Sequence, residues 1–396
     1  MCAVVDINMS FLKTTLKEKW WARLILVFLI ISYLMIVSSV VLIVYSENYD
    51  NWHLLSRISL GATVKSLDDV GRMGAQRYID QQLNPLTIDD ADFQRIRSKS
   101  MPKERNDLIW FAIEPMIYSR RQLQEVMTWF WDNHFNTNVN KHGQVQFEVD
   151  ENNAFRQHAL GRFRDLLDVS AKSPAMLVYL DSVRNHKREP NENYARELME
   201  LFTLGEGNYT EVDIKEAARA LTGWTLRNGE FKDVRHMHDP AKKTFLGKTG
   251  KFGGDDIIDI ILQQPATSRY LARKLLLFFV MPEPSSEMVE AVAVAIRGAD
   301  FDMREVMRRL LSSKVFYSPG ARHNLIKSPV QLVVGTIRRL EVEPLDLPAF
   351  VSATRGMGQQ LFQPPNVKGW DGDRKWITSA TIYARYNFAS ALLAGT

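Results

Sequence analysis

The chain has 396 residues, of which 45% are hydrophobic and 24% charged, a balance typical of a globular protein with an ample core. The 50 basic and 46 acidic residues give a formal net charge of only +4, so no nucleic acid partner is indicated. Cys2 is the single cysteine, which excludes an intramolecular disulfide and any metal site built from several cysteines.

An uncharged run from Leu24 to Tyr45 follows a short segment of mixed charge. The run exceeds the roughly 20 residues that span the hydrocarbon core of a bilayer, and aromatic residues stand at both of its ends, as at membrane interfaces. Basic residues precede it, so the positive-inside rule places the N-terminus in the cytoplasm. We therefore expect a short cytoplasmic segment (1–23), a single transmembrane anchor in the lipid bilayer (24–45) and an extracytoplasmic domain, periplasmic or extracellular (46–396).

A cleaved signal peptide is the alternative interpretation of the same run. The apolar region of a signal peptide is usually about 7–15 residues long and ends at small residues. Here the run is longer and ends in Ile43, Val44 and Tyr45, which favours an uncleaved anchor.

Helical periodicity continues through the rest of the chain, so we expect a mainly α fold: one N-terminal transmembrane helix followed by a large multi-helix globular domain. Alternating β-branched runs are nearly absent. The best of them, Gln144 to Val149, predicts a short hairpin arm after a turn at 140–143. The main helices are expected at 107–130 (interrupted near Pro115), 152–169, 210–222, 255–263, 266–280, 286–297, 303–312, 329–340 and 379–393.

The segment from Asn191 to Gly205 predicts one short helix with an asparagine cap at its start and a glycine cap at its end. One side is apolar. The other side is either an ordinary solvated face or, if buried, a site, because buried charges persist only when they are paired or bound. The charged residues of this polar side are Glu192, Arg196, Glu197 and Glu200, and they include two i,i+4 pairs.

Three loops carry more aromatic and charged side chains than a connection needs. Residues 129–135 place four aromatic residues around an aspartate and His134, which indicates a cleft wall or a corner of the core. Residues 235–247 include His238 beside another histidine and an aspartate, ligand types that suit several divalent ions, although no fixed motif spacing is present. Residues 363–376 hold two tryptophans that could stack on a sugar or peptide, or could lock the C-terminal helix onto the core.

Blocks of sequence in a fixed order run through the predicted extracytoplasmic domain. They are His53–Arg57, Gly61–Thr63, Trp129–Phe135, His158–Leu167, Ser173–Asp181, Asn191–Gly205, Ala218–Trp224, His238–Gly247, Asn366–Trp370 and Trp376–Ile377. Together they resemble the large bacterial family catalogued as domain of unknown function 1800, over about residues 53–390. The resemblance implies a bacterial, helical and often exported protein, and a second exported, sulfatase-like protein encoded nearby as a partner. It implies no activity.

Two functional hypotheses follow from these observations. The first is an extracytoplasmic enzyme with a polar or metal site on the helix from Asn191 to Gly205 and hydrolase-like chemistry. The second is a non-catalytic envelope scaffold, or an accessory protein for an exported partner or a cell-surface polymer, in which the charges of that helix form a buried ion network.

The enzyme hypothesis assigns roles to six residues, and a divalent metal is its one cofactor. The catalytic set is Glu197 as acid or ligand, Arg196 as a clamp for an anion and His134 as base or ligand. The metal set is His238, Glu200 and His158.

Overall fold

The computed structural model describes residues 25, 27–29, 31–33, 35, 49–97, 101–341 and 347–394. The chain divides into two units, residues 1–52 and 53–396, and all the elements discussed below belong to the second. Most of the anchor expected at 24–45 lies outside the described residues. Among those that are described, no helix is both long and apolar enough to cross a membrane.

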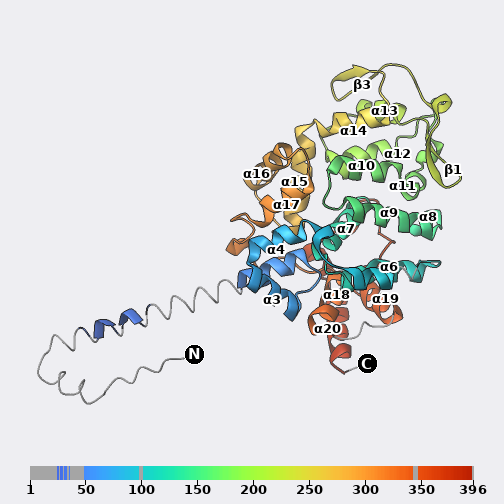
Figure 1. Cartoon of the computed structure of the whole chain (residues 1–396). Coiled ribbons are helices and arrows are strands. Elements are labelled where there is room, and N and C mark those ends of the chain that lie inside the picture. Colours follow the sequence, from blue (N-terminus) through green and yellow to red (C-terminus); the bar gives the residue numbers. More distant parts are fainter. Residues whose placement is uncertain are drawn as a thin grey trace, which may run out of the picture. The chain divides into compact units, whose positions relative to one another are not determined.

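The second unit is mainly helical, as the periodicity of the sequence predicts (Figure 1). Residues 53–58 are helical. The helices up to the first hairpin are α3 Val64–Met73, α4 Ala75–Gln82, η1 Pro85–Thr87, α5 Ala91–Arg97, α6 Arg105–Tyr118, α7 Gln122–His134, α8 Val139–His142, α9 Val145–His158, α10 Phe163–Lys172, α11 Pro174–Tyr179, η2 Ser182–Arg184, α12 Asn193–Glu197, η3 Leu198–Thr203 and α13 Glu211–Ala220.

The later helices follow the sequence expectation within a residue or two, and the helix expected at 329–340 has those bounds. A short turn, η4 Arg235–Met237, separates two hairpins. The helices after the hairpins are α14 Gly254–Leu262, α15 Pro265–Phe279, α16 Ser286–Gly298, α17 Met303–Leu311, η5 Pro319–Ala321, α18 Pro329–Leu340, α19 Leu347–Gly356, η6 Asp373–Trp376 and α20 Ser379–Ala394.

The interruption expected near Pro115 is wrong, because this proline lies within α6 and the chain breaks between α6 and α7 instead. The break is held by the buried carboxylate of Asp90. It accepts a hydrogen bond from the Ser119 hydroxyl at 2.7 Å and another from the backbone N–H of Arg120 at 2.8 Å. The second bond satisfies the Arg120 N–H, which a continuous helix would have paired internally.

The hairpin arm expected at Gln144 to Val149 is also wrong, because these residues form the first turns of α9. Buried residues recur along this helix at spacings of three and four, which is the helical period: Glu148, Val149, Glu151, Asn152 and Phe155. Several of them are polar, so a search for apolar periodicity misses the first half of the helix.

The helix expected over 152–169 is divided in two, with a turn between α9 and α10 at residues 159–162. The carbonyl oxygen of Gly161 in this turn accepts the N–H of Met303 at 2.9 Å, and the N–H of Phe163 donates to Phe301 O at 3.0 Å. A distant segment therefore fixes the break, which a local pattern cannot indicate.

Two antiparallel hairpins lie between α13 and α14, β1 Trp224–Arg227 with β2 Glu230–Asp233, and β3 Lys243–Phe245 with β4 Lys248–Gly250. Both have two-residue turns in which each residue has a positive φ, Asn228-Gly229 and Leu246-Gly247. This is the turn geometry that favours Asn-Gly in hairpins, so Asn228-Gly229 is a sequence signal for the first hairpin.

The centre of the unit is an aromatic cluster between α7, α9, α10 and η3. Trp131 is fully buried and its indole N–H donates to Ala159 O at 2.9 Å. Phe135 and Phe163 stack beside it, and Phe135 also meets Phe202 edge to face. Complete burial of a phenylalanine side chain contributes about 1.5–3 kcal/mol, so this cluster is a major source of stability.

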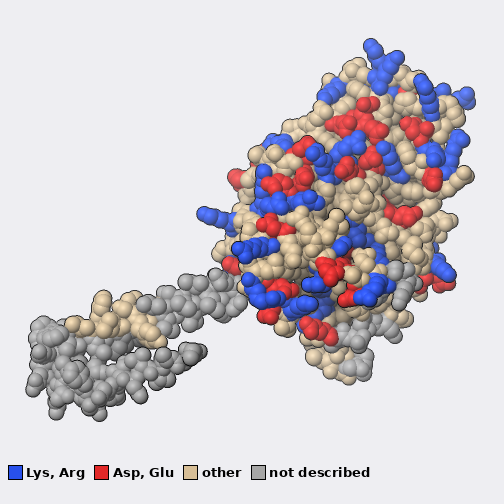
Figure 2. Space-filling model, viewed as in Figure 1, with Lys and Arg blue, Asp and Glu red and all other residues tan. Residues whose placement is uncertain are grey.

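Basic and acidic side chains alternate over the face of the second unit that Figure 2 shows. On the residues coloured there, neither sign dominates a broad area. This distribution agrees with the near-balanced charge of the sequence.

Candidate functional site

The segment from Asn191 to Gly205 has the glycine cap that the sequence predicts, but its N-cap is Glu192, whose side chain makes no capping bond, and its middle is not an ordinary α-helix. The side-chain oxygen of Asn191 accepts the N–H of Asn193 at 2.9 Å, and Gly205 has a positive φ of 77° with its N–H donating to Met199 O at 3.0 Å. Between the caps, α12 passes into the π-helix η3. Short π-helical turns are rare and often occur at functional sites.

Side chains from two other helices bind the carbonyl oxygens of η3. His134 at the end of α7 donates from Nε2 to Phe202 O at 2.9 Å, and the Tyr270 hydroxyl on α15 donates to Leu201 O at 2.5 Å. The Tyr270 ring also occupies the space beside Gly205, where a Cβ atom would lie 2.9 Å from Cδ2. The wide helical turn is thus held by specific contacts.

The second ring nitrogen of His134 is in contact with a lysine. Nζ of Lys274, on α15, lies 3.0 Å from Nδ1 of His134. Because a carbonyl oxygen can only accept, the bond to Phe202 places the ring hydrogen on Nε2, and Nδ1 is therefore the acceptor for Lys274. His134 is nearly fully buried and surrounded by aromatic rings.

The pair of His134 and Lys274 has no negative counter-charge within the described residues. Burial, and secondarily the charge of Lys368, lowers the pKa of Lys274 to about 8. Burial, and then the Lys274 charge, lowers the pKa of His134 well below its ordinary value, so this histidine is neutral. Lys274 can therefore exchange a proton near neutral pH.

Two carboxylates belong to the segment from Asn191 to Gly205 itself, Glu197 in α12 and Glu200 in η3. Glu197 is half-buried, and burial followed by the nearby Glu200 raises its pKa. Glu200 accepts the Tyr209 hydroxyl at 2.8 Å and, after burial, contributes to raising the pKa of Tyr270 to about 12. Lys274 Nζ lies 5.6 Å from the centre of the Tyr270 ring, so Glu200 and Lys274 both flank this tyrosine.

Arg196 is engaged in ion pairs and does not hold a free guanidinium for an anion. Its two Nη atoms contact the two carboxylate oxygens of Glu211, each at 2.9 Å, and Nη2 lies 3.5 Å from Glu192. The expected pair with Glu192 is present, whereas Glu211 takes the place of Glu200 as the other partner. The bidentate contact joins α12 to the start of α13, so the clamp role expected for Arg196 has no support from its contacts.

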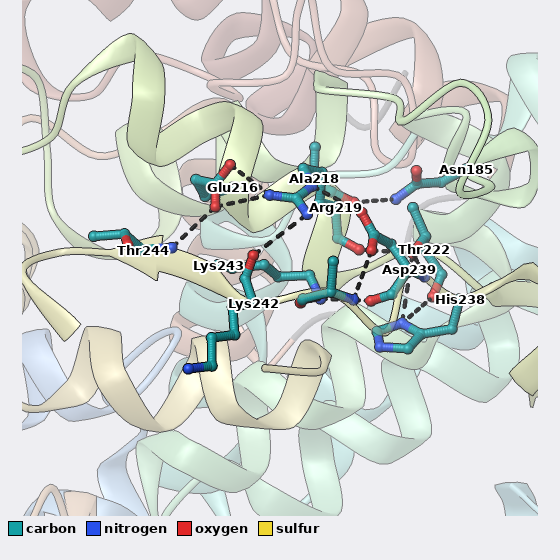
Figure 3. A network of polar contacts seen from close by, with 11 residues as sticks. Asn185, Glu216, Ala218, Arg219, Thr222, His238, Asp239, Lys242, Lys243 and Thr244 are labelled. Atoms are coloured by element: carbon teal, nitrogen blue, oxygen red, sulfur yellow. Dashed lines mark hydrogen bonds and ion pairs between the residues drawn. The ribbon is translucent and has the colours of Figure 1, made fainter. Parts of the chain in front are cut away.

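His238 belongs to a polar network formed by α13, the turn that follows it, the loop before β3 and the start of β3 (Figure 3). Its Nδ1 donates to Thr222 O at 2.9 Å, and the Thr222 hydroxyl accepts the N–H of Asp239 at 2.8 Å. Arg219 binds Asp239 and Glu216, each at 2.8 Å. Figure 3 shows Arg219 between these two carboxylates.

Lys243 is a buried member of the same network. It is 1% exposed, and its ammonium donates to Asp239 O at 2.5 Å and Ala241 O at 3.1 Å. The blocks Ala218–Trp224 and His238–Gly247 of the sequence thus meet in space. The network orders the chain around Asp239, and pairing with Arg219 contributes to a lowered pKa of this carboxyl against the effect of burial.

The residues predicted to bind a metal have separate environments. His238 contacts Thr222, Glu200 contacts Tyr209, and His158 ends α9 half-buried. No contact found among the described residues joins any two of the three. Throughout that part of the chain, no three His, Cys, Asp or Glu side chains gather in a group that could hold a metal ion.

A second group of buried titratable residues lies on α9. The Thr137 hydroxyl is 3.0 Å from Glu148 Oε2 and 2.9 Å from Glu151 Oε2, and His142 Nε2 is 2.8 Å from Glu148 Oε1. A hydroxyl donates only one hydrogen, so its second short contact requires a proton on a carboxyl oxygen. Burial raises the pKa of Glu148 to about 8 and that of Glu151 well above its ordinary range.

Sequence reasoning missed Lys274 and Tyr270, which contact His134 and η3. Both lie in α15, which was expected only as a core helix. A signal is present there, because Lys274 stands four residues after Tyr270 and four before Phe278 on a helix, and a lysine on such an aromatic stripe is unusual. The buried glutamates of α9 were missed because the segment was interpreted in part as a strand.

Comparison with known proteins adds a family but no activity. The family model described as "Protein of unknown function (DUF1800)" matches residues 53–395. No curated protein matches the chain, and no solved structure does. The match covers nearly all of the second unit, including η3, His134, Lys274 and the network of Figure 3. The chain therefore belongs to the DUF1800 family of proteins of unknown function, as its ordered sequence blocks predict.

Proposed function

We propose that this protein is a membrane-anchored extracytoplasmic enzyme with a hydrolase-like acid–base site at the segment from Asn191 to Gly205. One observation carries the proposal: the amine of Lys274 lies 3.0 Å from Nδ1 of the buried, neutral His134, and no carboxylate pairs with it among the described residues. Structural lysines are usually paired with carboxylates or extended into water.

In the proposed reaction, Lys274 is the base. Its amine form accepts a proton from an attacking water, and with a pKa of about 8 roughly a fifth of the amine is neutral near pH 7.4. His134 is a positioning residue, because both of its ring nitrogens are occupied and Nδ1 orients the lysine. Glu197 in its protonated form donates to the leaving group, a role that its raised pKa supports.

The location and the partners are parts of the same proposal. The run from Leu24 to Tyr45 would hold the protein in the bilayer, with the family domain on the outer side. A second exported protein encoded nearby is the proposed protein partner. A divalent metal at His238, Glu200 or His158 is not needed for the chemistry described above.

Selective modification of Lys274 tests the proposal directly. The full-length protein in mild detergent is acylated with trace acetic anhydride between pH 6 and 11, and each lysine is quantified by mass spectrometry. Lys274 should show an inflection near pH 8, and the exposed Lys251 is the internal reference for the reactivity of a lysine in water. A Lys274 that stays unreactive, or reacts with an ordinary profile, would refute its role as base.

An activity screen forms the second arm. Chromogenic esters, phosphate esters and glycosides are tested with the native protein and with Lys274→Met, Glu197→Gln and Lys251→Met. We expect turnover of at least one class that Lys274→Met and Glu197→Gln lose and Lys251→Met retains. Elemental analysis of the same samples tests the metal prediction, since stoichiometric metal lost in Glu200→Gln would restore a metal-dependent mechanism.

A scaffold role is the second candidate, and helix α20 favours it. This helix has no buried residue, and its exposed apolar side chains are Ile382, Tyr383, Tyr386 and Leu393. An exposed apolar face of this kind is typical of a surface for another protein. Co-purification of a stoichiometric partner that is lost in Tyr383→Ser with Tyr386→Ser, together with an unreactive Lys274, would favour the scaffold over the enzyme.

A further inference from the structure

A cavity of about 440 Å³ lies between α3, α4, the C-terminal end of α6 and the C-terminal end of α18. Its volume is in the range of small-molecule sites, which is about 300–1,000 Å³. None of its lining residues belongs to the segment from Asn191 to Gly205 or to the contacts of Lys274. The cavity is therefore a separate feature of the fold.

Two glycines bring α18 against the chain before α3 and so form one wall of the cavity. A Cβ atom on Gly61, which has a φ of +152°, would lie 2.8 Å from Gly335 O. A Cβ atom on Gly335 would lie 2.9 Å from Leu60 O. Any side chain at either position would separate these backbones, and their close contact places Arg338 beside Gly61.

Arg338 is a cation with only neutral partners. Its Nε donates to Gly61 O at 3.2 Å, and its Nη1 donates to Met116 O at 3.4 Å and to Ile117 O in the last turn of α6. In the described part of the chain, no carboxylate pairs with Arg338 and Nη2 has no hydrogen-bond partner. Burial lowers its pKa to about 10, so the guanidinium stays charged at neutral pH.

The other lining residues add hydrogen-bond donors around this cation. Burial raises the pKa of Tyr78 to about 12, so its phenol is protonated at neutral pH. Lys65 and Arg120 are exposed at the rim, and Lys65 lies in the first turn of α3, where the helix dipole is positive. Two of the lining residues are acidic. Asp69 is paired with Arg72, whereas Glu341 has no ion pair among the described residues.

Part of the remaining wall is apolar, and it lies beside neutral polar side chains such as Gln81, Gln82 and Gln122. The apolar part is formed by Ile88, Ile117 and Ile337, each of which is at most 7% exposed. A partly buried cation that no carboxylate pairs with, beside an apolar part of the wall, matches a ligand with an anionic head and an apolar body. We propose that this cavity binds a small organic anion, with a carboxylate or phosphate against Arg338 and Lys65 and its body against the three isoleucines.

Calorimetric titration of the full-length protein in mild detergent tests the proposal. The probes are benzoate, phenyl phosphate and benzamide, the last being a neutral analogue of benzoate. We expect 1:1 binding of at least one of the two anions, weakening by more than about fivefold between 50 and 500 mM NaCl, and no binding of benzamide. The stronger anion identifies the preferred head group.

Substitutions in the lining test whether the anions bind in this cavity. Arg338→Gln should weaken anion binding at least about 10-fold and Lys65→Gln about 3-fold, whereas Lys251→Gln, which removes one positive charge outside the cavity, should have no effect. Because Arg338 also binds three carbonyl groups, Lys65→Gln and Tyr78→Phe decide the matter if Arg338→Gln does not fold. Equal binding of benzamide, no binding of either anion up to about 10 mM, or unchanged affinity in the cavity variants would overturn the proposal.

Discussion

Lys274 donates to Nδ1 of His134 across 3.0 Å, although the two residues are 140 positions apart in the chain. The histidine in turn donates to the carbonyl of Phe202 in the π-helix η3. A lysine, a neutral imidazole and a wide helical turn are thereby joined into one chain of hydrogen bonds inside an aromatic core. Each of the first two predictions below changes one link of that chain.

Replacing Lys274 by methionine should stabilise the protein at neutral pH. The folded pKa of about 8 lies below the unfolded value, so the native state binds fewer protons than the unfolded state between about pH 8 and 10.4. Native stability therefore rises with pH across this window, and below it the burial penalty is fully present. Allowing for the lost hydrogen bond, Lys274→Met should gain about 2 kcal/mol at pH 7 and lose this advantage by pH 10.5. Urea unfolding at both pH values measures the difference; an equal difference at both would contradict the depressed pKa.

Replacing His134 by phenylalanine should destabilise the protein by about 2–4 kcal/mol. The change leaves the buried Phe202 O and the part-buried Lys274 Nζ without their partners. In a Lys274→Met background only the carbonyl loses a partner, so the cost should fall by about 1 kcal/mol. A double-mutant cycle by urea unfolding gives this coupling. Strict additivity would show that the two side chains do not interact.

Replacing Glu148 by glutamine should stabilise the protein at alkaline pH. The folded pKa of about 8 lies above the unfolded value, so the native state keeps a proton that the unfolded state loses near pH 4.5, and native stability falls as pH rises between these values. The glutamine side chain would keep the contact with Thr137 without ionising. Because Glu148 and Glu151 titrate together, the expected gain at pH 8 is only about 1–3 kcal/mol. Thermal unfolding at pH 5 and pH 8 checks it, and a gain of the same size at both pH values would exclude a shared proton.

Replacing Arg219 by lysine should loosen the network of Figure 3. A lysine cannot bind Glu216 and Asp239 together while also reaching Lys242 O, as the guanidinium does. We expect a loss of about 1–3 kcal/mol and faster hydrogen exchange in residues 238–243. Arg309→Lys, at an exposed pair with Glu305, is the matched control and should cost under about 1 kcal/mol. Unchanged exchange in Arg219→Lys would mean that the loop is ordered by other contacts.

The single cysteine provides a test of the proposed topology. If the N-terminus is cytoplasmic, a membrane-impermeant maleimide should label Cys2 only after cells are permeabilised. In a Cys2→Ser background, Lys251→Cys on the family domain should be labelled in cells whose outer barrier alone has been opened. Labelling of Cys2 in intact cells would reverse the orientation, and recovery of the whole protein in the soluble fraction after alkaline extraction would exclude the anchor.

Local chemistry explains what could be predicted from the sequence. Thr210 caps α13 through the reciprocal contact with Asp213, and Gly205 caps the C-terminal end of its segment. Caps and helical period depend on residues within one or two turns of each other. For this reason the mainly α class and most helix bounds follow from the sequence, and so does membership of the family, because its blocks are short and contiguous.

The two helix expectations that the structure corrects have a common cause. The first half of α9, from Val145 to Glu151, was missed because its buried side is largely polar. The chain break at Gly161 exists because the distant segment of Phe301 and Met303 accepts and donates its backbone hydrogen bonds. In both cases the deciding contact is long-range.

The charged residues of the segment from Asn191 to Gly205 show the same division. The sequence by itself determined that a capped helical segment with a crowded polar side stands at this place in a member of the family. Only the tertiary structure decided that Arg196 pairs with Glu211, that the segment widens into a π-helix, and that Lys274 meets His134 behind it. The physical reason is that burial and ion pairing depend on which distant surfaces pack together, whereas helix formation depends on neighbours along the chain.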